Sequence, residues 1–163
     1  MGIVSYTPRD WANGLVVLDS HLDTEVRDPW TEVQAAWSSG WDPASSWVGS
    51  TTNPVLNNGT TRGRYHQIGR TILWEGRIAM GSTTTYGSGT YSFSLPATPL
   101  GTAYMVGTAL LMSASAIHVG VVLWTGSAVN LRFHGASGIW SPTVPFTLAS
   151  GSSLYVSGAY QAA

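Results

Sequence analysis

The chain contains no cysteine and no lysine, and it has few charged residues of any kind. The absence of cysteine excludes disulfides, thiol catalysis and thiolate-bound metals. Charged residues make up 9% of the 163 residues, well below the roughly 25% of ordinary soluble domains. Solubility must therefore come from Ser, Thr, Gly and Asn, or apolar surface must be hidden by association with other chains.

The sequence also lacks a long hydrophobic run. Its longest candidate, residues 116–124, contains His118 and Gly120 and is about half of the roughly 18 residues that a membrane-spanning helix needs. The N-terminal MGIVSYTPRDW has neither the basic region nor the apolar region of a secretory signal. We therefore expect no membrane insertion and no secretory signal peptide.

Charge is divided unevenly along the chain. Residues 1–42 contain seven acidic residues and two arginines, net −5, whereas residues 43–163 contain Glu75 and five arginines, net +4. Such a break predicts regions with different roles. We expect an N-terminal attachment segment (1–40), a linker or arm rich in Gly, Ser, Thr and Pro (41–63), and a β-domain (64–163).

Two short helices are predicted in the N-terminal segment. Asp19 can cap a helix over residues 20–27, and Asp28-Pro29 can start a second one that reaches about Trp37. Since such short helices are marginal alone in water, an apolar stripe needs a partner surface. It can pack on the chain's own domain, or dock on another protein or on symmetry mates. The stripe consists of Leu18, Leu22 and Val26.

Residues 64–163 show a period of two and no helical periodicity. Residues 104–112 form a nearly continuous apolar run, and Gly, Ser and Pro separate the segments. The pattern predicts a mainly β protein, an antiparallel jelly-roll-like β-sandwich of about eight strands that follows the short helical segment. Apolar residues that alternate on one face are Ile72, Trp74, Ile78 and Met80; Tyr91, Phe93 and Leu95; Ile117, Val119, Val121 and Leu123; and Val129, Leu131 and Phe133.

The β-domain offers little catalytic chemistry. General acid–base catalysis by carboxylates needs two of them close together, and Glu75, expected to pair with Arg77, is the single acidic residue after position 42. The four histidines lie in different elements without metal-ligand spacing. His118 and His134 could face each other across strands, but packed or surface roles are the default. We expect a non-enzymatic protein with no metal and no cofactor.

The glycine-rich stretch GRIAMGSTTTYGSGTYSFSLP, residues 76–96, resembles a ligand-binding loop at first sight. A phosphate loop needs a helix after its glycines, whereas TYSFSL, residues 90–95, has the alternation of a strand. The segment from Gly81 to Gly89 is therefore expected to join two strands. Nucleic-acid binding is also disfavoured, because five arginines over about 120 residues form no dense patch.

A sugar-binding surface is the better-motivated ligand site. Aromatic side chains near predicted turns can stack on sugar rings, although core or subunit-interface positions are the competing interpretation. Arg132 and His134 would supply polar contacts to the sugar. The aromatic candidates are Tyr86, Tyr91, Trp124 and Trp140.

Three stretches of the sequence resemble small tail and virion-surface proteins of actinobacteriophages. YTPRDWANGLVVLDSHLDTEVRD is similar to the N-terminus of that group, although Asp23 replaces its usual Asn and Pro29 interrupts its usual helix. The run NPVLNNGTTRGRYHQIGRTILWEGRIAMGSTTTYGSGTYSFSLP and the ending LASGSSLYVSGAYQAA are similar to its middle and its end.

This resemblance implies a non-enzymatic homotrimer exposed on a phage particle, as a capsid decoration or as a minor tail or fibre-like component. Its expected partners are itself and other virion proteins of the capsid or tail. The alternative is a carbohydrate-binding module of a phage tail that recognises a host cell-surface glycan. The residues expected to attach the N-terminal segment to the virion are Tyr6, Trp11, Leu18, Leu22, Val26 and Arg27.

Overall fold

The computed structural model describes residues 33, 35–101 and 104–163. Within these residues the protein is mainly β, with eight strands in antiparallel sheets and no helical element. Of the second helix, predicted to reach about Trp37, the structure describes Val33, which has a helical backbone, and residues 35–37, which do not, so this helix ends before residue 35. The helix expected over residues 20–27 lies outside the described residues.

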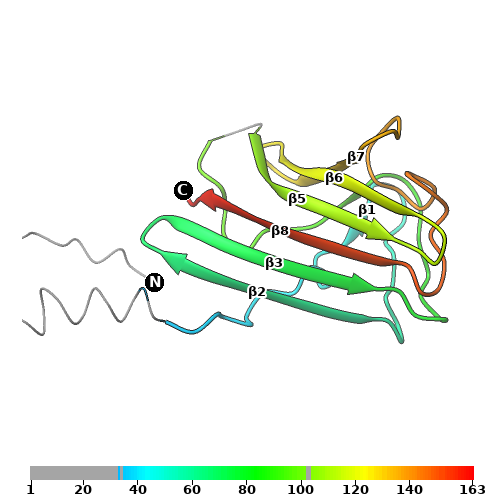
Figure 1. The fold of residues 1–163 in the computed structure, drawn as a ribbon, viewed down its shortest axis with the longest axis horizontal. Helices are drawn as coiled ribbons and strands as arrows, with labels where there is room; N and C mark the ends of the chain where they lie inside the picture. The colour runs from blue at the N-terminus through cyan, green and yellow to red at the C-terminus, as the bar shows by residue number, and fades with distance from the viewer. Residues whose placement is uncertain (1–32, 34, 102–103) are drawn as a thin grey trace, which may run out of the picture.

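Six strands form one antiparallel sheet, which Figure 1 shows from its outer face. The order across this sheet is β2-β3-β8-β5-β6-β7, so the last strand of the chain lies between β3 and β5. A β-bulge between Met105 and Gly107 interrupts the pairing of β5 with β6. The strands are β2 (Thr60–Ile68), β3 (Thr71–Ala79), β5 (Tyr104–Met112), β6 (Ile117–Trp124), β7 (Val129–Phe133) and β8 (Ser153–Gln161).

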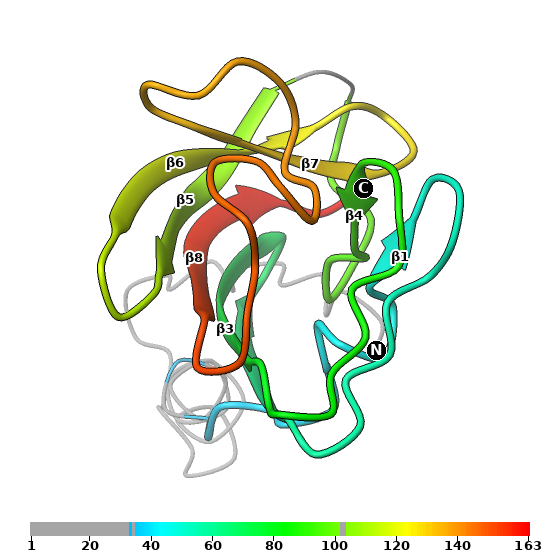
Figure 2. The ribbon, with the colours of Figure 1, turned by 90° about the vertical axis from the view of Figure 1, so that its right-hand side faces the viewer.

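A second layer packs on the inner face of this curved sheet (Figure 2). It contains a two-stranded sheet of β1 (Val48–Gly49) and β4 (Tyr91–Ser92), and otherwise consists of irregular segments. The expectation of a mainly β protein with about eight strands in antiparallel sheets is confirmed. Because the strands divide six and two rather than evenly, the jelly-roll-like arrangement stays a prediction.

The core between the two layers is rich in aromatic rings. Trp74 of β3 meets Trp41 edge to face at 5.5 Å, and Tyr91 meets Trp140 edge to face at 4.7 Å. The Trp74 indole Nε1 donates to the carbonyl oxygen of Val106 at 3.2 Å. These contacts join β3, β4 and β5 with segments outside the strands, so the irregular layer is held by the same core as the sheet.

The segment predicted as a linker or arm, residues 41–63, is part of this folded unit. Trp41 and Trp47 are buried in the core, and β2 already begins at Thr60. Trp41 lies over a cross-strand pair of glycines, Gly63 and Gly76. A Cβ on Gly76 would stand 3.0 Å from the Trp41 ring, so the missing side chains leave the space that the indole fills.

The glycine-rich segment after β3 joins strands, as expected. Backbone bridges pair it with residues 52–55, at Thr52–Ser88 and Val55–Thr85. Gly87 and Gly89 have φ values of +57° and +86°, a conformation that glycine adopts without steric cost. A β-carbon on Gly87 would also collide with the backbone of residues 52–53. These glycines therefore serve turn geometry and close backbone approach.

Candidate functional site

The outer face of the six-stranded sheet is the candidate site, because it combines apolar side chains, charge and a depression. Strand register places its side chains in rows that run across the strands. One row consists of Arg62, Arg77, Tyr155, Leu110 and Val119, and the next consists of Arg64, Glu75, Ser157, Thr108 and Val121.

Strand β6 presents its predicted apolar stripe to this outer face. The stripe of Ile117, Val119, Val121 and Leu123 is exposed or half-buried, whereas Val122 and Trp124 on the other side are buried. If that stripe is taken as the core-facing one, the orientation is wrong, because both faces of VGVVLW are apolar and a shift of one residue exchanges them. Trp124, which is larger than the side chains of the exposed stripe, is buried in the core, and its Nε1 donates to the Gly101 carbonyl at 3.0 Å.

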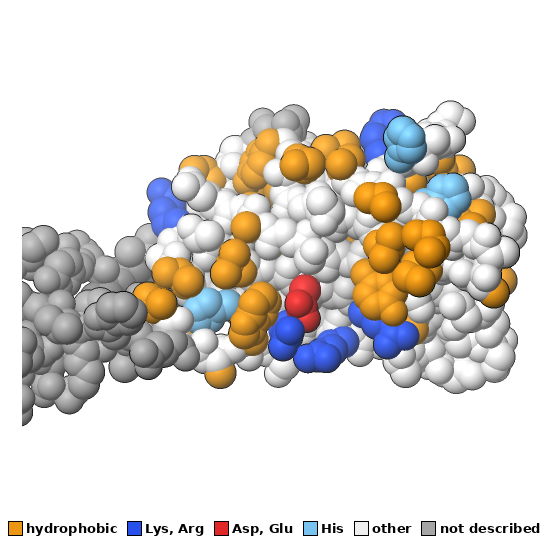
Figure 3. All heavy atoms as spheres, viewed as in Figure 1, with side chains coloured by type: hydrophobic (Ala, Val, Ile, Leu, Met, Phe, Trp, Pro, Cys, Tyr) orange, Lys and Arg blue, Asp and Glu red, His pale blue; other side chains and the backbone are white. Residues whose placement is uncertain are grey.

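The result is apolar surface on the outside of the sheet, and Figure 3 shows its largest group of apolar side chains on the right of the view, with smaller groups elsewhere. Most of the orange side chains on the right of this view lie beside arginines, and few acidic side chains appear. Monomeric soluble proteins rarely expose contiguous apolar patches of this kind without a function for them. The most exposed members, with their exposed fractions, are Ile117 (65%), Val119 (60%), Met105 (60%) and Tyr155 (39%).

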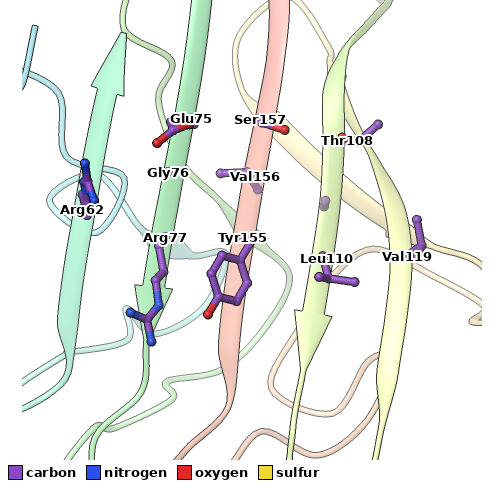
Figure 4. Close-up of a pocket in the computed structure, with 11 residues that line it drawn as sticks. Arg62, Glu75, Gly76, Arg77, Thr108, Leu110, Val119, Tyr155, Val156 and Ser157 are labelled. Carbon is purple, nitrogen blue, oxygen red and sulfur yellow. The ribbon is translucent and has the colours of Figure 1, made fainter. Parts of the chain in front are cut away.

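A depression of about 480 Å³ lies in the middle of this face. Its floor is formed by small side chains, Thr108 and Ser157, and by the backbone at Gly76. Figure 4 shows Arg62, Arg77 and Tyr155 along one side of it and Leu110 and Val119 along the other. The depression is open and shallow, so it suits a segment of protein chain better than an enclosed small molecule.

Charged side chains lie at both ends of this face, with Arg132 on β7 and the others on β2 and β3. Arg64 Nε donates to Glu75 Oε1 at 2.6 Å across the two strands. The prediction that Glu75 pairs with Arg77 is therefore wrong, since the direct cross-strand neighbour is closer than a residue two positions along the same strand. Arg77 instead lies over the Tyr155 ring, 5.4 Å from its centroid, which is a cation–π geometry.

The chain enters this face at the edge of the sheet. Ser38 pairs with Tyr65 of the edge strand β2 through two backbone hydrogen bonds of 2.7 and 2.9 Å. Trp37, which is 42% exposed, lies 4.9 Å from the Arg64 guanidinium and 6.3 Å from the His66 ring. His66 is buried, and its Nε2 has no hydrogen-bond partner among the described residues.

The structure does not bring the proposed sugar-binding residues together. Trp140 and Trp124 are buried, so neither indole can stack on a sugar ring. Arg132 and His134 are exposed at the β7 end of the outer face. Tyr86 is half-buried in the glycine-rich loop of the other layer. Tyr91, the fourth aromatic candidate, is fully buried.

Two buried tyrosines serve the fold and not a site. Burial raises the pKa of Tyr91 far above its usual range, and nearby Tyr86 adds to the shift; the Tyr91 hydroxyl donates to the Tyr86 carbonyl oxygen. Burial also raises the pKa of Tyr160 to about 12, and its hydroxyl donates to the Ala97 carbonyl at 2.8 Å. Each hydroxyl therefore ties β4 or β8 to an irregular segment.

The described part of the chain contains neither a candidate metal site nor a candidate membrane-spanning helix. His118 packs against Phe146 at 5.7 Å, on the side of β6 opposite to Val119, so it does not face His134. Residues 33, 35–101 and 104–163 contain no group of three His, Cys, Asp or Glu residues placed to hold a metal. Nor do they contain a helix long and apolar enough to cross a membrane.

Sequence reasoning missed the central residues of the outer face, Arg62, Leu110 and Tyr155. The continuous apolarity of residues 104–112 was the available signal, because a strand that is apolar on both sides either lies inside a protein or presents one side to a partner. The predicted attachment residues Tyr6, Trp11, Leu18, Leu22, Val26 and Arg27 lie outside the described residues. Comparison of the chain with protein-family models, curated proteins and solved structures gave no match.

Proposed function

We propose that the protein is a non-enzymatic structural component of a bacteriophage particle. In this proposal it is a homotrimer on the virion surface, as a capsid decoration or a minor tail or fibre-like component, and residues 1–40 attach it to the particle. The outer face of the six-stranded sheet forms the contacts between copies. The sequence motifs similar to actinobacteriophage virion proteins supply the biological context.

The exposed apolar stripe on β5, β6 and β8 is the observation that carries the proposal. Val119, Ile117 and Met105 are each at least 60% exposed, and no charged side chain lies within the β5–β6 part of the face. Burial of such surface stabilises an association by roughly 25 cal/mol per Å² of apolar area. Burial of this face between the subunits of an obligate oligomer would therefore explain its apolar composition.

Glycan recognition, the alternative function, needs exposed aromatic rings, and its two tryptophan candidates are not exposed in this fold. Trp124 and Trp140 are buried, and stacking on a sugar ring needs an exposed aromatic face. Arg132, His134 and Tyr86 remain accessible, but they lie on different elements of the two layers. No described arrangement of these residues favours this function over assembly.

Mass in solution and incorporation into particles test the proposal separately. Light scattering of a chain that lacks residues 1–40 is expected to give three times the mass of that chain at micromolar concentration, and a monomer would contradict the homotrimer. A chain without residues 1–40 retains the core from Trp41 onward. It is expected to fold and to be missing from purified particles, whereas normal incorporation would refute attachment through this segment.

A further inference from the structure

The outer face needs an occupant that offers both apolar side chains and negative charge. Arg62 and Arg77 are exposed beside the apolar stripe. The acidic residue on the same face, Glu75, already binds Arg64 at 2.6 Å. Contacts between copies through the apolar β5–β6 part of the face would leave these two cations without a free carboxylate.

Residues 1–32 have that composition. They contain six acidic residues and two arginines, net −4, whereas the described residues contain Asp42, Glu75 and five arginines, net +3. The segment also carries the predicted apolar stripe of Leu18, Leu22 and Val26. Its charge and its apolar side chains therefore complement the two features of the outer face.

The place where this segment joins the fold points to the same face. Ser38 is hydrogen-bonded to the edge strand β2, and the Trp37 ring lies against Arg64 and His66. By the register of β2 with β3, both of these β2 side chains share the outer face with Arg62. His66 is buried beside this entry point, and its Nε2 has no hydrogen-bond partner among the described residues.

We infer that, in the free chain, residues 1–32 fold back and cover the outer face of their own six-stranded sheet. The acidic side chains lie along Arg62 and Arg77, and the apolar stripe lies on Val119, Leu110 and Tyr155. A tether that starts at the edge of the same sheet gives the segment an effective concentration on the order of millimolar. Docking within one chain is therefore favoured over docking on another.

This inference goes beyond the proposed assembly role, since it concerns the subunit before it joins a particle. The same segment is proposed to attach to the virion, and the same face is proposed to contact other copies. Covering the apolar face in the free chain would limit premature association. The docking can be present or absent whether or not the assembled protein is a trimer.

The absence of cysteine makes thiol reactivity a clean test. V119C places a thiol on the outer face of the sheet, where Val119 is 60% exposed. V55C is the control and places a thiol on the other layer, where Val55 is 53% exposed. In the full chain, alkylation of V119C relative to V55C is expected to be about tenfold slower or more, which corresponds to a face that is covered for at least about nine-tenths of the time. Each rate is normalised to that of the same variant in denaturant.

Variants that change the charge of residues 1–32 or of the outer face test whether this segment is what covers the face. D19N/D23N/E25Q removes acidic partners without altering the sheet, and R62E/R77E reverses the cations on the face. Each set is expected to bring alkylation of V119C to within about twofold of V55C, and circular dichroism confirms folding. Protection that disappears on dilution while the charge variants leave it unchanged would assign the face to a second copy and overturn the inference. Equal rates in the unaltered background would also overturn it. Both measurements use the full chain, whereas the homotrimer is tested on the chain that lacks residues 1–40, so the two proposals can fail separately.

Discussion

The indole rings of Trp47 and Trp140 stack with 4° between their planes and 5.5 Å between their centroids. One ring comes from the segment before β1 and the other from the segment after β7, and Tyr91 of β4 meets both edge to face. These three aromatic rings hold the segments before β1 and after β7 against β4 in the core.

Removal of the Trp140 ring is therefore expected to be costly. Trp140→Ala should lower the free energy of unfolding by about 3–5 kcal/mol, through lost burial and the cavity that remains. Urea denaturation followed by circular dichroism measures the change. Trp37→Ala removes an indole that is 42% exposed and should cost less than half as much. Equal losses for the two variants would contradict the role of Trp140 in the core.

Gly158 allows β8 to approach β5 beneath the Trp74 ring. A Cβ at this position would collide with the Val106 carbonyl oxygen and lie 2.5 Å from Gly107 Cα, and both neighbours are backbone. Gly158→Ala is therefore expected to destabilise the protein by about 1–3 kcal/mol. Gly135→Ala is the comparison for side-chain size, since nothing lies within 4 Å of its Cβ, although its φ of +75° adds strain of its own. Thermal unfolding that leaves Gly158→Ala at the original midpoint would refute the steric argument.

The ion pair between Arg64 and Glu75 should contribute little to stability. Its side chains are 37% and 42% exposed, and pairs of that exposure contribute about 0–1 kcal/mol because solvent screens them. Glu75→Gln is thus expected to change the free energy of unfolding by less than about 1 kcal/mol, with the difference shrinking at high salt. A larger loss in urea titrations would show that the pair is coupled to further contacts.

The proposed assembly makes Val119 the most informative position on the outer face. Val119→Asp puts a charge into the apolar stripe and is expected to weaken self-association at least about tenfold, because the carboxylate would lose its water on assembly. Val55→Asp, at a position that is 53% exposed on the other layer, should leave association unchanged. Sedimentation of both variants in the chain that lacks residues 1–40, over a range of concentrations, measures the effect. Unaltered assembly of Val119→Asp would place the contact between copies elsewhere.

The hydroxyl of Tyr160, on β8, should make the stability of the protein sensitive to alkaline pH. Burial raises the pKa of Tyr160 from 10.0 to about 12, so the folded state holds its proton more tightly than the unfolded state does. The resulting stabilisation is present in full below pH 10 and is lost as the pH rises through about 12. Tyr160→Phe should be less stable at neutral pH, because the Ala97 backbone loses its partner, but should lose less stability between pH 9 and about 12. Parallel alkaline slopes for both proteins would contradict this assignment.

The sequence predicted the β class and several strand faces correctly, and β3 shows why. Its larger apolar residues recur with a period of two, apart from Leu73, and Ile72, Trp74 and Ile78 are all buried as that period requires. Strand β5 coincides with the continuous apolar run of residues 104–112. In β6 the same reasoning could not choose a face, because Val119 and Val122 are equally apolar and only the neighbouring strands fix the register.

By itself, the sequence determined that the protein would be poor in charge, mainly β and equipped with an acidic N-terminal segment, because these follow from composition and from local periodicity. Tertiary structure alone decided that Trp41 and Trp47 belong to the core and that Arg64 is the partner of Glu75. It also decided which side of β6 remains outside. Those outcomes depend on contacts between residues far apart in the chain, where packing against specific neighbours overrides local preference. The apolar outer face, on which both proposals rest, is a product of that packing.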